Sequence, residues 1–205
     1  PYIYSGLLSG VTCFVDHYYF IEGVAKALNK FGLKGAVGEV VADLGGAFPS
    51  YENWAQTKNK IENWAYTDIQ PVVCPHAMNT VSPKLLKECS EFAKQNDLPL
   101  HMHLSQMQSE YDLVYKNFQK SPVELADECG AISEKSLLVH LVSAKRDDLK
   151  MIKDRGATIG FCPTSQILYE KLSPIEEFMN LDIPLALGTD CAASNDSADI
   201  LAELK

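Results

Sequence analysis

Five histidines and one late aspartate are the residues whose types and positions point to chemistry. Each histidine of this 205-residue chain lies at or near the end of a stretch typical of a buried strand: His17, His76, His101, His103 and His140. Asp190 follows the last such stretch, in Gly188-Thr189-Asp190. Imidazole and carboxylate groups bind Zn²⁺ and similar divalent ions. If the strands end at a common opening, the pattern predicts a divalent-metal site there.

The elements that must position these residues alternate along the chain. Strands are expected over residues 11–15, 34–41, 69–74, 98–104, 137–141, 157–161 and 183–187. Helical patterns are expected over residues 19–31, 50–65, 83–93, 111–118, 122–129, 145–155, 174–181 and 197–205, with Ser50 and Ser82 as N-caps. Near-continuous apolar strands separated by helices predict a parallel sheet covered on both faces, with its active site at the carboxyl ends of the strands.

Seven strand–helix units favour a (β/α)8 TIM-like barrel that is incomplete by one unit, forming a single domain over residues 1–205. An open-sheet ligand-binding protein is the weaker alternative, because no glycine-rich first turn is present. The chain starts without Met and ends inside a helical pattern, so we expect a fragment of a longer protein. Two open strand edges would remain, so we expect either a homo-oligomer or a segment such as residues 1–8 covering them.

The composition of the chain argues against several classes of partner. Lys and Arg number 18 against 27 Asp and Glu, for a formal charge of −9, which argues against nucleic acid or an anionic membrane surface as partner. No apolar run of about 18 residues is present, so no membrane span is expected. Six scattered cysteines without a CxxC pair indicate reduced thiols and a cytoplasmic protein. The expected partner is a small-molecule substrate.

Each candidate residue also has a purely structural interpretation. A lone strand histidine is more often a core residue, Asp190 can be a helix N-cap, and His17 can be structural or substrate-facing. His101 and His103 are two residues apart, so their side chains share one face of the strand, and the barrel interior is favoured. A nucleophilic pair of Cys74 and His76 is a weakly supported alternative.

Four strings resemble the amidohydrolase superfamily. They are His101-Met102-His103-Leu104-Ser105, Pro75-His76-Ala77-Met78-Asn79, Cys162-Pro163-Thr164-Ser165 and Leu187-Gly188-Thr189-Asp190-Cys191. They are most similar to the branch that holds methylthioadenosine/S-adenosylhomocysteine deaminases and related chlorohydrolases. The resemblance covers the whole chain in order.

The resemblance implies a metal-dependent hydrolase that deaminates, or dehalogenates, a heterocyclic substrate by means of a metal-activated water. It implies Zn²⁺, or another divalent metal such as Fe, held by His103 and Asp190. Asp190 would also accept the proton, and His140 would orient the water or stabilise the developing oxyanion. His76 would contact the substrate, and His101 would be a neighbour of the site rather than a ligand.

Two departures from the family pattern stand out. The His-x-His pair that the family carries on its first strand is absent, and we expect it upstream of Pro1. The deaminase branch has Glu three residues after the fifth-strand ligand, where this chain has Gln106, a neutral amide that can hydrogen-bond to a substrate but cannot transfer a proton. Glu110, one helical turn on, is a candidate substitute. The alternative function is therefore a truncated or degenerate barrel that binds no metal and has no activity.

Overall fold

The computed structural model describes residues 2–45, 53–168 and 171–204. Its strands are β1 (Cys13–Tyr18), β2 (Lys34–Val41), β3 (Ile69–Pro71), β4 (Cys74–Pro75), β5 (Leu100–Leu104), β6 (Ser136–His140), β7 (Thr158–Phe161) and β8 (Leu185–Leu187). Its helices are α1 (Tyr2–Leu8), α2 (Ile21–Lys30), α3 (Trp54–Glu62), α4 (Pro83–Gln95), α5 (Gln108–Phe118), α6 (Pro122–Glu128), α7 (Arg146–Arg155), α8 (Pro163–Leu168), α9 (Ile175–Asn180) and the 3-10 helix η1 (Ala202–Leu204).

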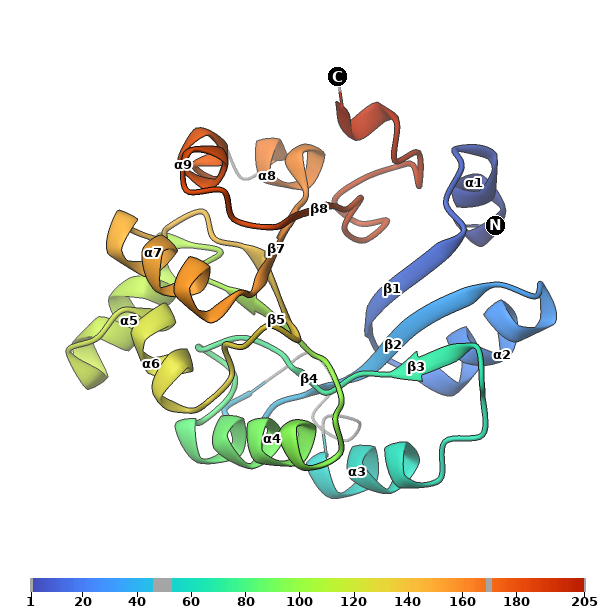
Figure 1. The fold of residues 1–205 in the computed structure, drawn as a ribbon, viewed down its shortest axis with the longest axis horizontal. Helices are drawn as coiled ribbons and strands as arrows, with labels where there is room; N and C mark the ends of the chain where they lie inside the picture. The colour runs from blue at the N-terminus through green and yellow to red at the C-terminus, as the bar shows by residue number, and fades with distance from the viewer. Residues whose placement is uncertain (1, 46–52, 169–170, 205) are drawn as a thin grey trace.

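All the strand pairs of the described chain are parallel. β1, β2 and β3 form one sheet in which β4 also pairs with β2, and β5, β6, β7 and β8 form a second. A bridge between Val73 and Leu100 joins the two sheets. The result is one curved layer of strands with helices outside it (Figure 1). The predicted incomplete parallel barrel is confirmed.

Local sequence explains how the helices begin. Ser82 accepts a hydrogen bond from Leu85 N, with Pro83 at the first helical position. Ser121 and Glu124 form a reciprocal capping box at α6. The buried faces of α4, α6 and α7 pack on the strands in one apolar cluster that includes Leu86 and Ile152. This packing fixes the strand ends relative to one another.

Several elements differ from the sequence prediction, which included neither helix α1 nor helix α8. β1 begins at Cys13 and extends to Tyr18, because His17 and Tyr18 continue the ladder opposite Gly38 and Glu39. His17 therefore lies inside the strand and not after it.

The expected strand over 69–74 is divided into β3 and β4. Their register on β2 is unchanged, with Val37 opposite Pro71 and Val40 opposite Cys74. The two pieces are therefore halves of one strand. Between them, the Val73 N–H donates to Pro99 O, next to β5, instead of to β2.

The expected final helix over 197–205 is wrong for most of its length, because among the described residues 197–204 only Ala202–Leu204 is helical, as a 3-10 turn. Asn195 explains the difference: its side chain accepts from Ser197 N and donates to Glu203. Such side-chain bonds compete with a helix. The expected N-cap Ser50 lies outside the described residues, and Asn53 caps α3.

β1 and β8 stand at the two ends of the strand order. Helix α1 lies beside the segment that follows β8, where the Tyr2 hydroxyl donates to Asp190 O at 3.2 Å and the Ser9 hydroxyl to Ala198 O at 3.1 Å. Residues 2–8 therefore join the two ends of the strand order through this segment. Self-association stays a prediction.

Candidate active site

Unusual backbone conformations gather where the strands end. Ser105, His140, Leu141 and Asp190 all have positive φ, between 50° and 83°, and they follow or close β5, β6 and β8. Residues other than glycine seldom adopt this region, and packing must hold them there. The fold thus holds strained backbone at the carboxyl ends, where the sequence predicts the site.

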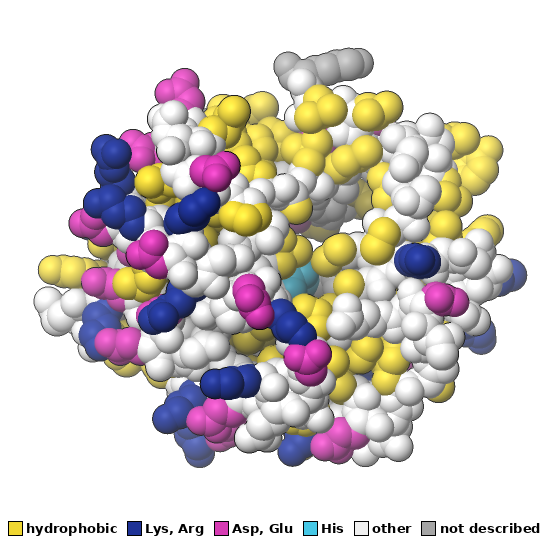
Figure 2. All heavy atoms as spheres, in the orientation of Figure 1, with side chains coloured by type: hydrophobic (Ala, Val, Ile, Leu, Met, Phe, Trp, Pro, Cys, Tyr) yellow, Lys and Arg dark blue, Asp and Glu magenta, His cyan; other side chains and the backbone are white. Residues whose placement is uncertain are grey.

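The histidines converge on this end of the sheet. The His17 ring centroid lies 4.6 Å from that of His103, 4.8 Å from His101 and 6.2 Å from His76. His103 lies 5.1 Å from His76 and stacks on His140 at 5.3 Å. Figure 2 shows histidine at the bottom of a hollow near the centre of the molecule. All five imidazoles therefore form one cluster around His103, whose ring lies within 6.4 Å of the other four. The sequence did not predict that His17 lies among these rings.

Hydrogen bonds set the tautomer of two rings. His103 Nδ1 lies 3.2 Å from His76 O, an acceptor only, so Nδ1 carries the proton and Nε2 keeps its lone pair. His76 Nδ1 lies 2.8 Å from the Thr80 hydroxyl, which itself donates to Ala77 O. A backbone or side-chain partner on Nδ1 is the usual support of a histidine that binds metal through Nε2.

Asp190 is held by two donors. The Ser165 hydroxyl donates to its Oδ2 at 2.5 Å, and Cys191 N donates to Oδ1 at 2.7 Å. Burial lowers the pKa of His140, and the nearby Asp190 carboxylate acts in the opposite direction. His140 is therefore stacked on His103 and is close enough to Asp190 for the carboxylate to affect its pKa. Ser165 was not predicted, because its role depends on α8 starting directly after β7.

The pKa values of three of these imidazoles are lowered, which favours their neutral form. Burial lowers the pKa of His17 and of His103 well below the usual value, and neighbouring histidines lower both further. Burial lowers the pKa of His101 to about 4. Neutral imidazole is the form that binds a metal.

Several of these ring nitrogens have no hydrogen-bond partner within the part of the chain that the structure describes. They are both nitrogens of His17 and Nδ1 of His101 and of His140. A buried polar atom without a partner is costly. Imidazole nitrogens beside a carboxylate are a donor set that suits Zn²⁺. His103 Nε2, which keeps its lone pair, and the oriented Asp190 carboxylate are donors of this kind, so they fit a divalent metal.

Gln106 and Glu110 occupy different environments. Gln106 is half-buried at the end of β5. The Glu110 carboxylate is buried and accepts hydrogen bonds from Ser105 N at 3.1 Å and Gln106 N at 2.9 Å. It therefore braces the loop that carries Gln106, and its role as a substrate contact stays a prediction.

The alternative nucleophile pair Cys74 and His76 lacks a reactive thiol. Cys74 is fully buried, and burial raises its thiol pKa well above the usual value. A protonated thiol is a poor nucleophile.

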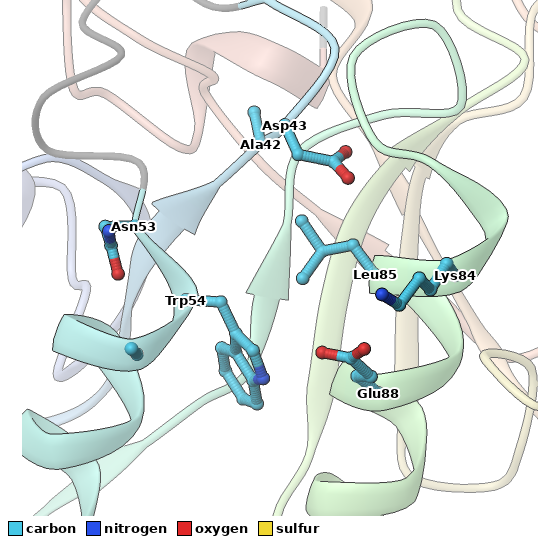
Figure 3. A pocket seen from close by; sticks show the side chains of 8 residues that line it. Ala42, Asp43, Asn53, Trp54, Lys84, Leu85 and Glu88 are labelled. Carbon is cyan, nitrogen blue, oxygen red and sulfur yellow. The ribbon is translucent and has the colours of Figure 1, made fainter.

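A separate hollow of about 320 Å³ lies between the start of α3 and α4 (Figure 3). Asp43 in its wall accepts from Ser82 N and from the Ser82 hydroxyl, and Trp54 packs edge-on against Phe92. None of the histidines lines it. These contacts are those of a junction between helices.

Parallel strands surrounded by helices, with imidazoles and a carboxylate near their carboxyl ends, form a barrel-like sheet of the kind that carries its active site at this end. Comparison with known families agrees, since residues 6–205 match the amidohydrolase family. The chain belongs to the amidohydrolase family.

Similar proteins share this assignment. The chain is 35% identical to a 5-methylthioadenosine/S-adenosylhomocysteine deaminase of Pyrococcus furiosus and 32% identical to a 5'-deoxyadenosine deaminase of Methanothrix thermoacetophila, over 96% of this chain in both cases. These alignments cover 48% and 47% of the two relatives. The chain thus spans about half the length of the curated relatives it matches.

Solved structures show the same fold. An adenosine deaminase of Xanthomonas campestris with bound zinc superposes with a TM-score of 0.90 at 25% identity, over 98% of this chain and 47% of that one. A guanine deaminase of C. acetobutylicum gives a TM-score of 0.86 at 22% identity, over 97% of this chain and 50% of that one. Among the described helices, none is both long and apolar enough to cross a membrane.

Proposed function

We propose that the protein is a metal-dependent hydrolase that deaminates a heterocyclic amine, and that its substrates are adenine nucleosides like those for which the relatives are named. The observation that supports the proposal is the stacking of His103 on His140 at the strand ends, with the Asp190 carboxylate close enough to His140 to raise its pKa. Hydrolytic removal of a chlorine substituent, as in the related chlorohydrolases, is the second reaction to consider. Six free thiols support a reducing compartment such as the cytoplasm.

His103 and Asp190 would hold the metal, through Nε2 and a carboxylate oxygen. When bound, a divalent ion lowers the pKa of water and polarises the carbon under attack. Two protein ligands are fewer than the three or more that catalytic zinc sites use. The proposed activity therefore requires at least one further ligand beyond these two.

The chain's own residues move the proton. Asp190 is oriented by Ser165 and Cys191 N, which leaves its carboxylate ready to take a proton from the attacking water and to give it to the leaving amine. The neutral His140 ring can hydrogen-bond to the oxygen as negative charge develops. His76, fixed by Thr80, and Gln106 would contact the heterocycle.

Ammonia release tests the proposal. Full-length protein with added Zn²⁺ is assayed on adenosine, guanine and cytosine analogues, beside Asp190→Asn. We expect ammonia from an adenine nucleoside and a loss of about 100-fold or more in kcat for the variant, as for removal of a general base. If the protein binds metal and releases no ammonia from any compound of the panel, the proposal is overturned. If it releases no ammonia and binds no metal, the result supports the alternative of a barrel without catalysis.

A further inference from the structure

A second group of metal-ligating side chains lies beside the site described above. His17 of β1, Cys74 of β4 and His101 of β5 place one ligand atom each within 4.8 Å of the others. None of the three is among the residues proposed to hold the catalytic metal. The proposed catalytic chemistry uses none of them either.

Cys74 and His101 lie one layer deeper in the barrel, and the His17 ring is close to both layers, 4.8 Å from the His101 ring and 4.6 Å from that of His103. His101 precedes His103 by two residues, and Cys74 precedes His76 by two, so each deeper residue shares a strand face with one residue of the catalytic layer. Backbone bonds lock this register, since His101 N donates to Val73 O at 3.0 Å and His103 N to His76 O at 2.9 Å. The sequence prediction placed His101 as a mere neighbour of the site.

Gly38 makes room for the thiol. A Cβ atom at Gly38 would lie 2.1 Å from Cys74 Sγ and 2.6 Å from Val72 O. Gly38 stands opposite His17 in the β1–β2 ladder. β2 therefore presents no side chain at the one place where the thiol and the His17 ring approach each other, and any other residue would displace the sulfur.

The imidazoles of this group are unsatisfied. His17 and His101 are each 8% exposed. Neither nitrogen of His17, nor Nδ1 of His101, has a hydrogen-bond partner among the residues of the described ranges. As a plain core cluster, the group would leave three buried nitrogens unpaired. A cation would satisfy the lone pairs of both rings.

We propose that His17, Cys74 and His101 form a second metal site, distinct from that of His103 and Asp190, which takes Zn²⁺ or a similar borderline-soft divalent ion. Thiolate with two imidazoles is a common zinc donor set. Zn–S bonds of about 2.3 Å and Zn–N bonds of about 2.0–2.1 Å hold tetrahedral ligand atoms about 3.5 Å apart. Closure by about 1 Å assembles the site, and the thiol releases its proton to solvent on binding.

The ion would brace the barrel. His17 and Cys74 belong to the first sheet and His101 to the second, so one ion joins the two sheets near the bridge between Val73 and Leu100. This role goes beyond the proposed hydrolase activity and does not depend on it.

Cobalt substitution tests the proposal on full-length, metal-free protein. A thiolate bound to Co²⁺ gives an intense near-ultraviolet charge-transfer band that histidine and carboxylate ligands do not give. We expect this band in the unmodified protein, its loss in Cys74→Ser with one equivalent of bound Co²⁺ fewer, and its retention in Cys89→Ser. Cys89 is the matched control because it is an equally buried thiol on α4.

No band in the unmodified protein overturns the proposal, and so does a band that persists in Cys74→Ser. The first result does not depend on whether any variant folds. Asp190→Asn separates the two proposals, because it should abolish ammonia release and keep the band.

Discussion

At the scale of single residues, Gln106 is the position where this chain departs most clearly from the deaminase pattern. A glutamate there supplies an acid for the purine ring, whereas an amide only hydrogen-bonds. The residue is half-buried and lies directly after β5. Its backbone N–H donates to the Glu110 carboxylate, a bond that a change of the side chain at 106 leaves in place.

We predict that Gln106→Glu raises kcat/KM for an adenine nucleoside at least about tenfold, because a general acid contributes 10²–10⁴-fold in well-formed sites. Gln108→Glu, on the exposed start of α5, should leave it unchanged. The assay is steady-state ammonia release at saturating Zn²⁺. An unchanged or lower value for Gln106→Glu would mean that ring protonation does not limit the reaction.

Glu110 predicts a pH effect on stability. Burial raises the pKa of this carboxyl to about 7 from its usual 4.5, against the effect of the backbone donors. Its folded-state pKa is thus above the unfolded value, so its contribution is full below pH 4.5 and is lost as pH rises to 7. That loss amounts to about 3 kcal/mol of unfolding free energy.

In Glu110→Gln this loss should vanish. The difference in unfolding free energy between unmodified protein and variant should therefore change by about 3 kcal/mol between pH 4.5 and 7. Denaturant titrations at several pH values measure it, with Glu91→Gln on the exposed face of α4 as control. Parallel curves for Glu110→Gln would contradict the account.

At the scale of elements, Glu39 ties β2 to two helices. Its side chain is 1% exposed, and it accepts from Phe20 N at 2.7 Å, where α2 begins, and from Lys60 Nζ of α3 at 2.8 Å. Burial lowers the pKa of Lys60, but contact with Glu39 outweighs it and the pKa is raised. β2 in turn holds β1 and β4, which carry His17 and Cys74.

We predict that Glu39→Ala lowers the free energy of unfolding by about 3 kcal/mol, since it leaves donors and a cation without their buried acceptor. Lys58→Ala removes an exposed pair with Glu62 and should cost at most about 0.5 kcal/mol. Urea denaturation compares the two. Equal small losses would show that Glu39 does not join these elements.

At the scale of the whole molecule, α1 joins the two ends of the strand order. The Tyr2 hydroxyl donates to Asp190 O and to Ser197 O, at 3.2 and 3.3 Å. The segment that carries Asp190, the proposed catalytic carboxylate, is thus held by helix α1. We propose Tyr2 as a positioning residue for Asp190.

We predict that Tyr2→Phe costs about 1 kcal/mol of stability, the net value of such bonds, and lowers kcat more than it raises KM. Tyr4→Phe is the matched control, because Tyr4 is exposed on the same helix. Thermal unfolding and steady-state kinetics of the full-length protein test this. Unchanged kcat in Tyr2→Phe would remove the positioning role.

Much of this organisation could be predicted from sequence, since the apolar strands and the histidines that end them are local signals. The position of His103 and His140 at one opening followed from parallel strand geometry. The place of His17 in the cluster could not be predicted in this way. His17 belongs to strand β1 only because β2 supplies its partner in the ladder, Gly38. The hold of Ser165 on Asp190 depends on contacts 25 residues apart, and the register that joins Cys74 to His101 depends on two sheets meeting.

Anomalous diffraction at the zinc edge, on crystals of the full-length protein, tests the central claim most directly. The account predicts a zinc peak about 2.0–2.2 Å from His103 Nε2 and from an Asp190 carboxylate oxygen, with His140 beside it. Crystals with stoichiometric zinc and no peak at these two residues would contradict it.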